Sequence, residues 1–170
     1  MNWIKSCLLL VLIATLSSCN FFRHYDFRGA NIPEDVQTFS VEYFTNEAEY
    51  INPSLSMDFT EKMKTKFQTE TRLGLSANPG DYQFAGRITR YSITPATLNN
   101  NTGTAQNQFS ITVRVEFASP LYPEKNFAQD FSFFKIFEAN QNFQSIESAL
   151  TDEITDNLVQ QIFAKVALDW

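Results

Sequence analysis

The sequence contains only one histidine and two cysteines in 170 residues. So few imidazoles and thiols exclude most zinc-type metal sites and any dense disulfide framework. Basic residues are also scarce and scattered: 13 lysines and arginines stand against 19 aspartates and glutamates, for a net charge of −6 at pH 7. Because a nucleic-acid-binding protein needs a basic surface to neutralise phosphates, we expect no nucleic-acid partner.

Glycine and proline are sparse too, at five and six residues, while 44% of the chain is hydrophobic. This composition excludes collagen-like, low-complexity and disordered chains. Phenylalanine is what the sequence has in excess, with 17 residues, and this favours a β-rich core filled with aromatic rings. The length fits one domain with a sizeable core.

The first residues have the pattern of a bacterial export signal. Lys5 precedes an apolar run over residues 7–16, which is too short to span a bilayer because a spanning helix takes ~20 residues. A basic start followed by a short apolar run and small residues is typical of a secretory signal. The residues Leu16-Ser17-Ser18-Cys19 resemble the lipobox of bacterial lipoproteins, whose cysteine carries a diacylglycerol thioether.

We therefore expect a signal peptide at residues 1–18, lipid attachment at Cys19 and a short lipidated tether over residues 19–29. Several acyl chains make a stable membrane anchor, whereas a single chain is marginal. Asn20 follows the cysteine, whereas aspartate there is the usual retention signal for the inner membrane, so the expected location is the cell outer membrane. The alternative is an ordinary signal peptide in which the cysteine occurs by chance.

Residues 30–170 are expected to form a single domain containing strands and helices. The clearest strand covers residues 109–117, where apolar and polar side chains alternate strictly, so one face is buried and the other faces water. A strand over residues 82–93 changes the phase of its alternation near residues 89–90, which indicates a β-bulge. Two further strands are expected at residues 36–44 and 126–137, and an exposed polar loop at residues 98–108.

Two helices are predicted from apolar residues at helical spacing. The first opens at Asn52-Pro53, with asparagine as the cap and proline at the first helical position. Lys62, Lys64 and Lys66 lie mostly opposite its apolar stripe; we interpret them as a solvated face, with contact to anionic lipid as the alternative. The second helix opens at Ser145. The order β-α-β-β-β-α predicts an α+β fold, a four-stranded sheet with two helices packed on one face.

No catalytic arrangement is visible in the sequence. It has no glycine-rich phosphate loop and no serine or cysteine nucleophile with a histidine beside it. The acidic pairs Glu34-Asp35 and Asp152-Glu153 are adjacent residues, which do not face each other on a helix. We therefore expect a binding or assembly protein rather than an enzyme, with no catalytic residue, no cofactor and no metal.

Several stretches, spread over nearly the whole mature chain, carry a family resemblance. They are Phe27-Arg28-Gly29-Ala30-Asn31-Ile32-Pro33 with Val36 to Val41, Asn52-Pro53-Ser54-Leu55 with Phe59-Thr60-Glu61, Thr71-Arg72-Leu73, Phe84-Ala85-Gly86-Arg87-Ile88 with Tyr91, and Ile162-Phe163 with Trp170. These stretches resemble the LptE family, the lipopolysaccharide-assembly lipoproteins. The resemblance implies a two-helix, four-strand domain in the lumen of an LptD-type outer-membrane β-barrel, where it helps insert lipopolysaccharide into the outer leaflet. No short functional signature exists, so no binding residue is carried over.

Arg87, Arg90 and Arg114 are the candidate contacts for lipopolysaccharide. They fall at polar or bulge positions of the two middle strands and are expected on the water-facing side of the sheet. Arginine binds phosphate through a planar fork, and lipid A carries phosphates in most bacteria. The alternative is that they are ordinary solvated or ion-paired residues. For the whole protein, the alternative is a stand-alone envelope lipoprotein that binds a small ligand or caps another envelope complex.

Overall fold

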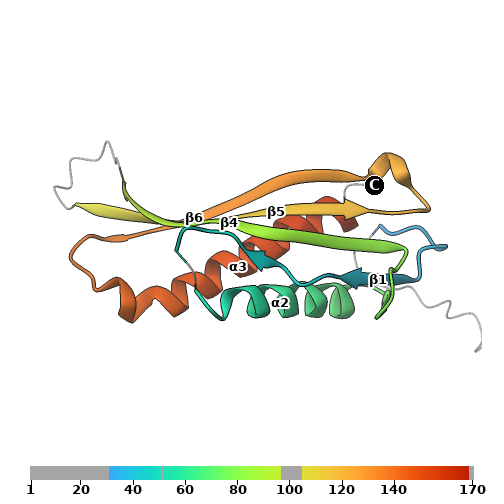
Figure 1. Ribbon diagram of the computed structural model, residues 1–170, viewed down its shortest axis with the longest axis horizontal. Coiled ribbons are helices and arrows are strands. Elements are labelled where there is room, and N and C mark those ends of the chain that lie inside the picture. The colour runs from blue at the N-terminus through green and yellow to red at the C-terminus, as the bar shows by residue number, and fades with distance from the viewer. Residues whose placement is uncertain (1–30, 51, 97–104, 169–170) are drawn as a thin grey trace, which may run out of the picture.

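The computed structural model describes residues 31–50, 52–96 and 105–168, which form two layers (Figure 1). The centre of the sheet is an antiparallel meander of β4 (Tyr82–Ala96), β5 (Gln106–Ala118) and β6 (Phe127–Glu138). Two helices, α2 (Leu55–Glu70) and α3 (Phe143–Ala167), cover one face of this sheet. The predicted α+β class and the placement of both helices on one face are confirmed. Cys19, the signal peptide and the tether lie outside the described residues.

The sheet has six strands, so the predicted count of four is wrong. β1 (Thr38–Val41) runs parallel to β4, and two strands of two residues, β2 (Thr45–Asn46) and β3 (Gly74–Leu75), pair with β4 and β1 respectively. The order across the sheet is β3-β1-β4-β5-β6, and β2 lies beside β4. Two residues are too few to show an alternating pattern, so sequence periodicity does not reveal such strands. The predicted strand over residues 36–44 is in fact the short strand β1.

The two long central strands follow the predicted alternation. The apolar residues of β5, Phe109, Ile111, Val113, Val115 and Phe117, are all buried. The predicted bulge is present, because the register between β4 and β5 shifts between Ile88 and Arg90. The predicted loop is too long at its C-terminal side, since residues 106–108 extend β5 by pairing with both neighbouring strands. Residues 97–104 lie outside the described part of the chain.

Both helices begin at residues other than those predicted. α2 follows Ser54, and Asn52 accepts hydrogen bonds at its Oδ1 from the amide and hydroxyl of Ser54, at 3.1 and 3.2 Å. α3 begins at Phe143, and the Oδ1 of Asn142 accepts a hydrogen bond from the Gln144 amide at 3.0 Å, so Asn142 rather than Ser145 is the cap. In the described part of the chain, neither helix is apolar enough over sufficient length to cross a membrane.

The two ends of the sheet have different neighbours (Figure 1). At one end, the amide of Asn31 donates a hydrogen bond to the Ala167 carbonyl at the end of α3. The connection between β5 and β6, with the 3-10 helix η2 (Pro123–Lys125), lies there too, and the Tyr122 hydroxyl donates to Asp35. At the opposite, distal end lie the last residues of β4, the first residues of β5 and the start of α3.

Candidate functional site

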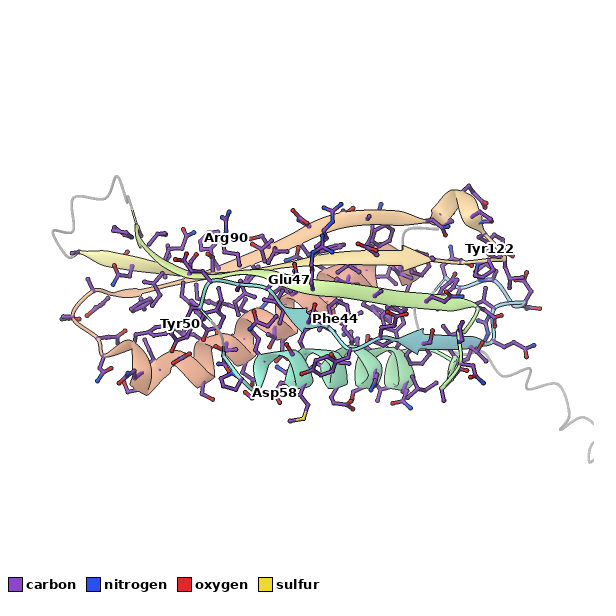
Figure 2. The ribbon with its side chains drawn as sticks, in the orientation of Figure 1. Phe44, Glu47, Tyr50, Asp58, Arg90 and Tyr122 are labelled. Carbon is purple, nitrogen blue, oxygen red and sulfur yellow. The ribbon has the colours of Figure 1, made fainter. Side chains whose placement is uncertain are left out.

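The three candidate arginines lie on one face of the sheet. Ile88 and Val113 are paired and buried beneath the helices, so the residues beside them point the other way. Arg87 is directly opposite Arg114, and Arg90 is opposite Thr112. We call this surface of β4, β5 and β6, on the side away from the helices, the polar face. Figure 2 shows Arg90 projecting from it, away from both helices.

Two of the three arginines are held by carboxylates. Arg87 Nε lies 3.1 Å from Glu47 Oε2, and its Nη1 lies 3.7 Å from Glu116 Oε1. Arg114 Nη1 lies 3.1 Å from Asp130 Oδ1 on the neighbouring strand. These ion pairs satisfy both guanidinium groups with the protein's own carboxylates, which leaves them less available to a phosphate.

Arg90 differs from the other two because the bulge changes its neighbour across the strands. It is exposed and faces Thr112, a neutral residue, rather than a carboxylate. Within the described part of the chain, its guanidinium has no ion-pair or hydrogen-bond partner. Arg90 is therefore the cation of this face that remains available to an external anion, a distinction that the sequence alone did not make.

Hydroxyl side chains surround Arg90 on the polar face. Thr112 Oγ1 and Ser132 Oγ lie 3.1 Å apart, and Ser92 Oγ and Ser110 Oγ lie 3.2 Å apart. Each hydroxyl is both a donor and an acceptor. Ser110 is buried, so Ser92, Thr112 and Ser132 are the hydroxyls of this set that could bind an anionic, oxygen-rich headgroup at Arg90.

The polar face becomes apolar toward the distal end. Phe134 pairs with Ser110 and is 49% exposed, and Ile136 pairs with Gln108 and is 40% exposed. Phe133 points to the opposite, helix side and is half-buried, which settles the orientation of the two adjacent phenylalanines. Along this face the side chains thus change from ion pairs, through Arg90 and its neighbouring hydroxyls, to exposed apolar groups. This order suits an amphiphilic ligand.

The helix layer has a separate polar groove of about 1400 Å³ between α2 and α3. Lys62 Nζ lies 2.5 Å from carboxylate oxygens of both Asp152 and Asp156, and donates to Thr155 Oγ1 at 3.0 Å. Burial lowers the pKa of Lys62, but the hydrogen bonds to the two aspartates outweigh it and raise that pKa above its ordinary value. The predicted solvated face is wrong for this lysine, since it joins the two helices.

The described residues, from 31 to 168 with gaps at 51 and 97–104, contain no group of three or more histidine, cysteine, aspartate or glutamate side chains that could hold a metal ion. The chemistry of the polar face is that of a binding surface: one available cation, hydroxyls and exposed apolar side chains. These groups provide contacts for a ligand or partner.

Solved bacterial proteins of low sequence identity share this fold. A minor lipoprotein from Acinetobacter baumannii is 16% identical, with a TM-score of 0.55 over 79% of this chain and 95% of that chain. An uncharacterised lipoprotein B from Nitrosomonas europaea is 13% identical, with a TM-score of 0.50 over 79% of this chain and 84% of that one. A Xanthomonas campestris protein is 7% identical, with a TM-score of 0.55 over 80% of this chain and 86% of the other. The chain thus has a fold found in bacterial lipoproteins.

The family model that matches the chain is LptE, described as lipopolysaccharide-assembly, and the match covers residues 36–166. The chain belongs to the LptE family. No curated protein matches it. The match spans every strand and nearly all of both helices, so the sequence resemblance to this family is confirmed. The family is thus one of lipopolysaccharide assembly.

Proposed function

We propose that this protein is an outer-membrane lipoprotein, anchored through lipid on Cys19, that lies within an LptD-type β-barrel and helps assemble lipopolysaccharide in the outer membrane. The observation that carries the proposal is the family match over residues 36–166. The lipobox-like residues at 16–19 support the anchor. A tether over residues 19–29, even fully extended, reaches at most ~35–40 Å and would keep the domain close to the bilayer.

The polar face supports the barrel as the partner. The lumen of outer-membrane barrels is polar, so a domain inside one needs an exterior that forms hydrogen bonds. Thr112 and Ser132 provide such groups across β5 and β6, and Arg114 and Asp130 add an ion pair. A polar exterior also suits a stand-alone envelope lipoprotein, so the partner has to be identified directly.

Photo-crosslinking in living cells distinguishes the two functions. With a photoreactive residue at Asn100 or Thr112, we expect a dominant adduct with an outer-membrane barrel after irradiation. In the Cys19→Ala variant, which cannot be lipidated, the chain should remain a longer precursor and the adduct should disappear. Monomer alone at both positions, at normal expression, would contradict the barrel proposal and favour the stand-alone lipoprotein.

Arg90 is the residue that we propose contacts a phosphate of lipopolysaccharide. Its guanidinium is exposed and, within the described part of the chain, has no carboxylate partner, whereas Arg87 and Arg114 are ion-paired. A guanidinium donates two parallel hydrogen bonds to a phosphate. Arg87 and Arg114 instead form ion pairs that link neighbouring strands, to Glu116 and Asp130 respectively.

The variant Arg90→Gln should weaken lipopolysaccharide binding by at least about tenfold, since a hydrogen bond to a charged group contributes ~1.5–3 kcal/mol. The measurement is titration of the detergent-solubilised lipoprotein with fluorescently labelled lipopolysaccharide. Lys64→Gln removes the same charge from the helix side, where Lys64 pairs with Glu61, and should leave binding within about twofold. Equal losses in the two variants would show that only net charge matters and that Arg90 is not a contact.

A further inference from the structure

The two edges of the sheet are protected very differently. On one side the outermost strands are β3 and β2, each only two residues long. On the other side β6 has twelve residues, paired with β5 without interruption from Gln106↔Glu138 to Phe117↔Phe127. No described strand pairs with the outer edge of β6. Half of the backbone amides and carbonyls of an edge strand point outward, so this edge presents an extended row of hydrogen-bonding groups.

Strand edges that face solvent usually carry features that prevent pairing with other chains, such as proline, a bulge or an outward lysine. β6 contains no proline or glycine, and its register with β5 shows no bulge. Two of its charged residues are ion-paired within the chain: Asp130 Oδ1 lies 3.1 Å from Arg114 Nη1, and Lys135, on the helix side, has its Nζ 2.5 Å from Glu153 Oε2. The polar side instead exposes Phe134 and Ile136. This edge therefore has the properties of a strand that receives a partner.

We propose that the outer edge of β6 pairs with an extended segment of another polypeptide, whose aliphatic side chains cover Phe134 and Ile136. The partner strand supplies backbone hydrogen bonds along the edge, the mode of recognition known as β-augmentation. Its residues opposite Phe134 and Ile136 are apolar, and the residue between them is not basic, because it lies opposite Lys135. In a closed barrel each wall strand is already paired on both sides, so a barrel partner would use a loop or a terminal arm.

Charge disfavours the two self-pairings that would cover Phe134 with Phe134 or Ile136 of a second copy of this chain. Two copies of β6 related by a two-fold axis pair antiparallel, and each register fixes which residues are opposite. Pairing Phe134 with Ile136 of the other copy places two Lys135 side chains directly opposite each other. Pairing Phe134 with Phe134 places Asp130 opposite Glu138. Like charges that face each other across a strand pair are destabilising, so these self-pairings are disfavoured.

The test uses the full-length lipoprotein in living cells, with a photoreactive residue at Ile136. We expect an adduct whose mapped peptide is an apolar-X-apolar segment of a different polypeptide, with X not basic. Phe134→Lys places a charge at this edge and should lower the adduct yield by at least about tenfold, since it buries an unpaired ammonium in the interface. Thr94→Lys is the matched control: Thr94 pairs with Gln108, which pairs with Ile136, so the same charge is added on the same face, in the row of Ile136 and away from the edge.

Each remaining outcome would overturn the proposal. These outcomes are an adduct with a second copy of this chain, an adduct with residues 19–30 of the same chain, no polypeptide adduct, or an equal loss with Thr94→Lys. The proposal rests on the sheet edge and not on lipopolysaccharide contact. Arg90→Gln should leave the Ile136 adduct unchanged, so the failure of one proposal is distinguishable from the failure of the other.

Discussion

Replacing Val113 with aspartate is expected to lower the free energy of unfolding by about 3–5 kcal/mol. Val113 lies in the middle of β5, between Ile88 and Phe131 on the flanking strands, and its side chain is fully buried. A carboxylate at this position has apolar neighbours on both sides and no cation to pair with, so its desolvation is uncompensated. The melting temperature should fall by roughly 6–20 °C, measured by thermal unfolding followed with circular dichroism.

Thr112→Asp is the matched control, one residue earlier in the same strand. Thr112 lies on the polar face, opposite Arg90 and Ser132. Both variants place aspartate in a strand, so the loss of β-propensity is similar, and Thr112→Asp should cost only about 1 kcal/mol. Equal destabilisation of the two variants would mean that β5 does not bury the face that the structure assigns to the core.

The long strands could be predicted from the sequence because one buried face imposes a period of two on many consecutive residues. Residues 109–117 of β5 carry that pattern, and even the bulge beside Arg90 was visible as a change of phase. β2 and β3 were missed for the same physical reason. Each has two residues, and such strands are defined by the backbone of a neighbour rather than by their own side chains.

The candidate site was predicted only at the level of the face. The alternation of side chains along the strands predicted that Arg87, Arg90 and Arg114 share one face, and the structure does bring them to one side of the sheet. Which arginine is available depends on Glu47, Glu116 and Asp130, which come from separate elements. No local pattern encodes those partners, since they are brought together by the register between strands.

The distinction between Lys62 and Lys64 has the same origin. The two residues are two positions apart on α2, and both are predicted from the sequence to face water. Lys64 pairs within its own helix, with Glu61, whereas Lys62 reaches Asp152 and Asp156 of α3. Helical periodicity describes one helix, and the presence of a second helix beside it is a tertiary fact.

Gly86 is another residue whose role only the tertiary structure reveals. It lies in β4 opposite Val115, on the side of the strand that faces the helices. The ring of Phe44 is fully buried against this position and packs edge-on against Phe59, with ring centroids 5.1 Å apart. A Cβ atom at residue 86 would lie 2.5 Å from Phe44 Cε1 and would overlap the carbonyl oxygen of Arg114. The missing side chain thus creates the space that the phenylalanine ring occupies.

Gly86→Ala is therefore expected to destabilise the protein by about 2–3 kcal/mol, because the ring and the backbone of β5 must both shift to admit one methyl group. Gly74→Ala is the control: its Cβ would meet only the Gln37 carbonyl oxygen at 3.8 Å, and neither glycine has a left-handed φ. That variant should be neutral or more stable by up to about 1 kcal/mol, since alanine restricts the unfolded chain. Adding Phe44→Leu to Gly86→Ala should cost less than the sum of the single changes, because the smaller side chain relieves the overlap. Additive losses in urea unfolding would show that Phe44 does not fill the space above Gly86.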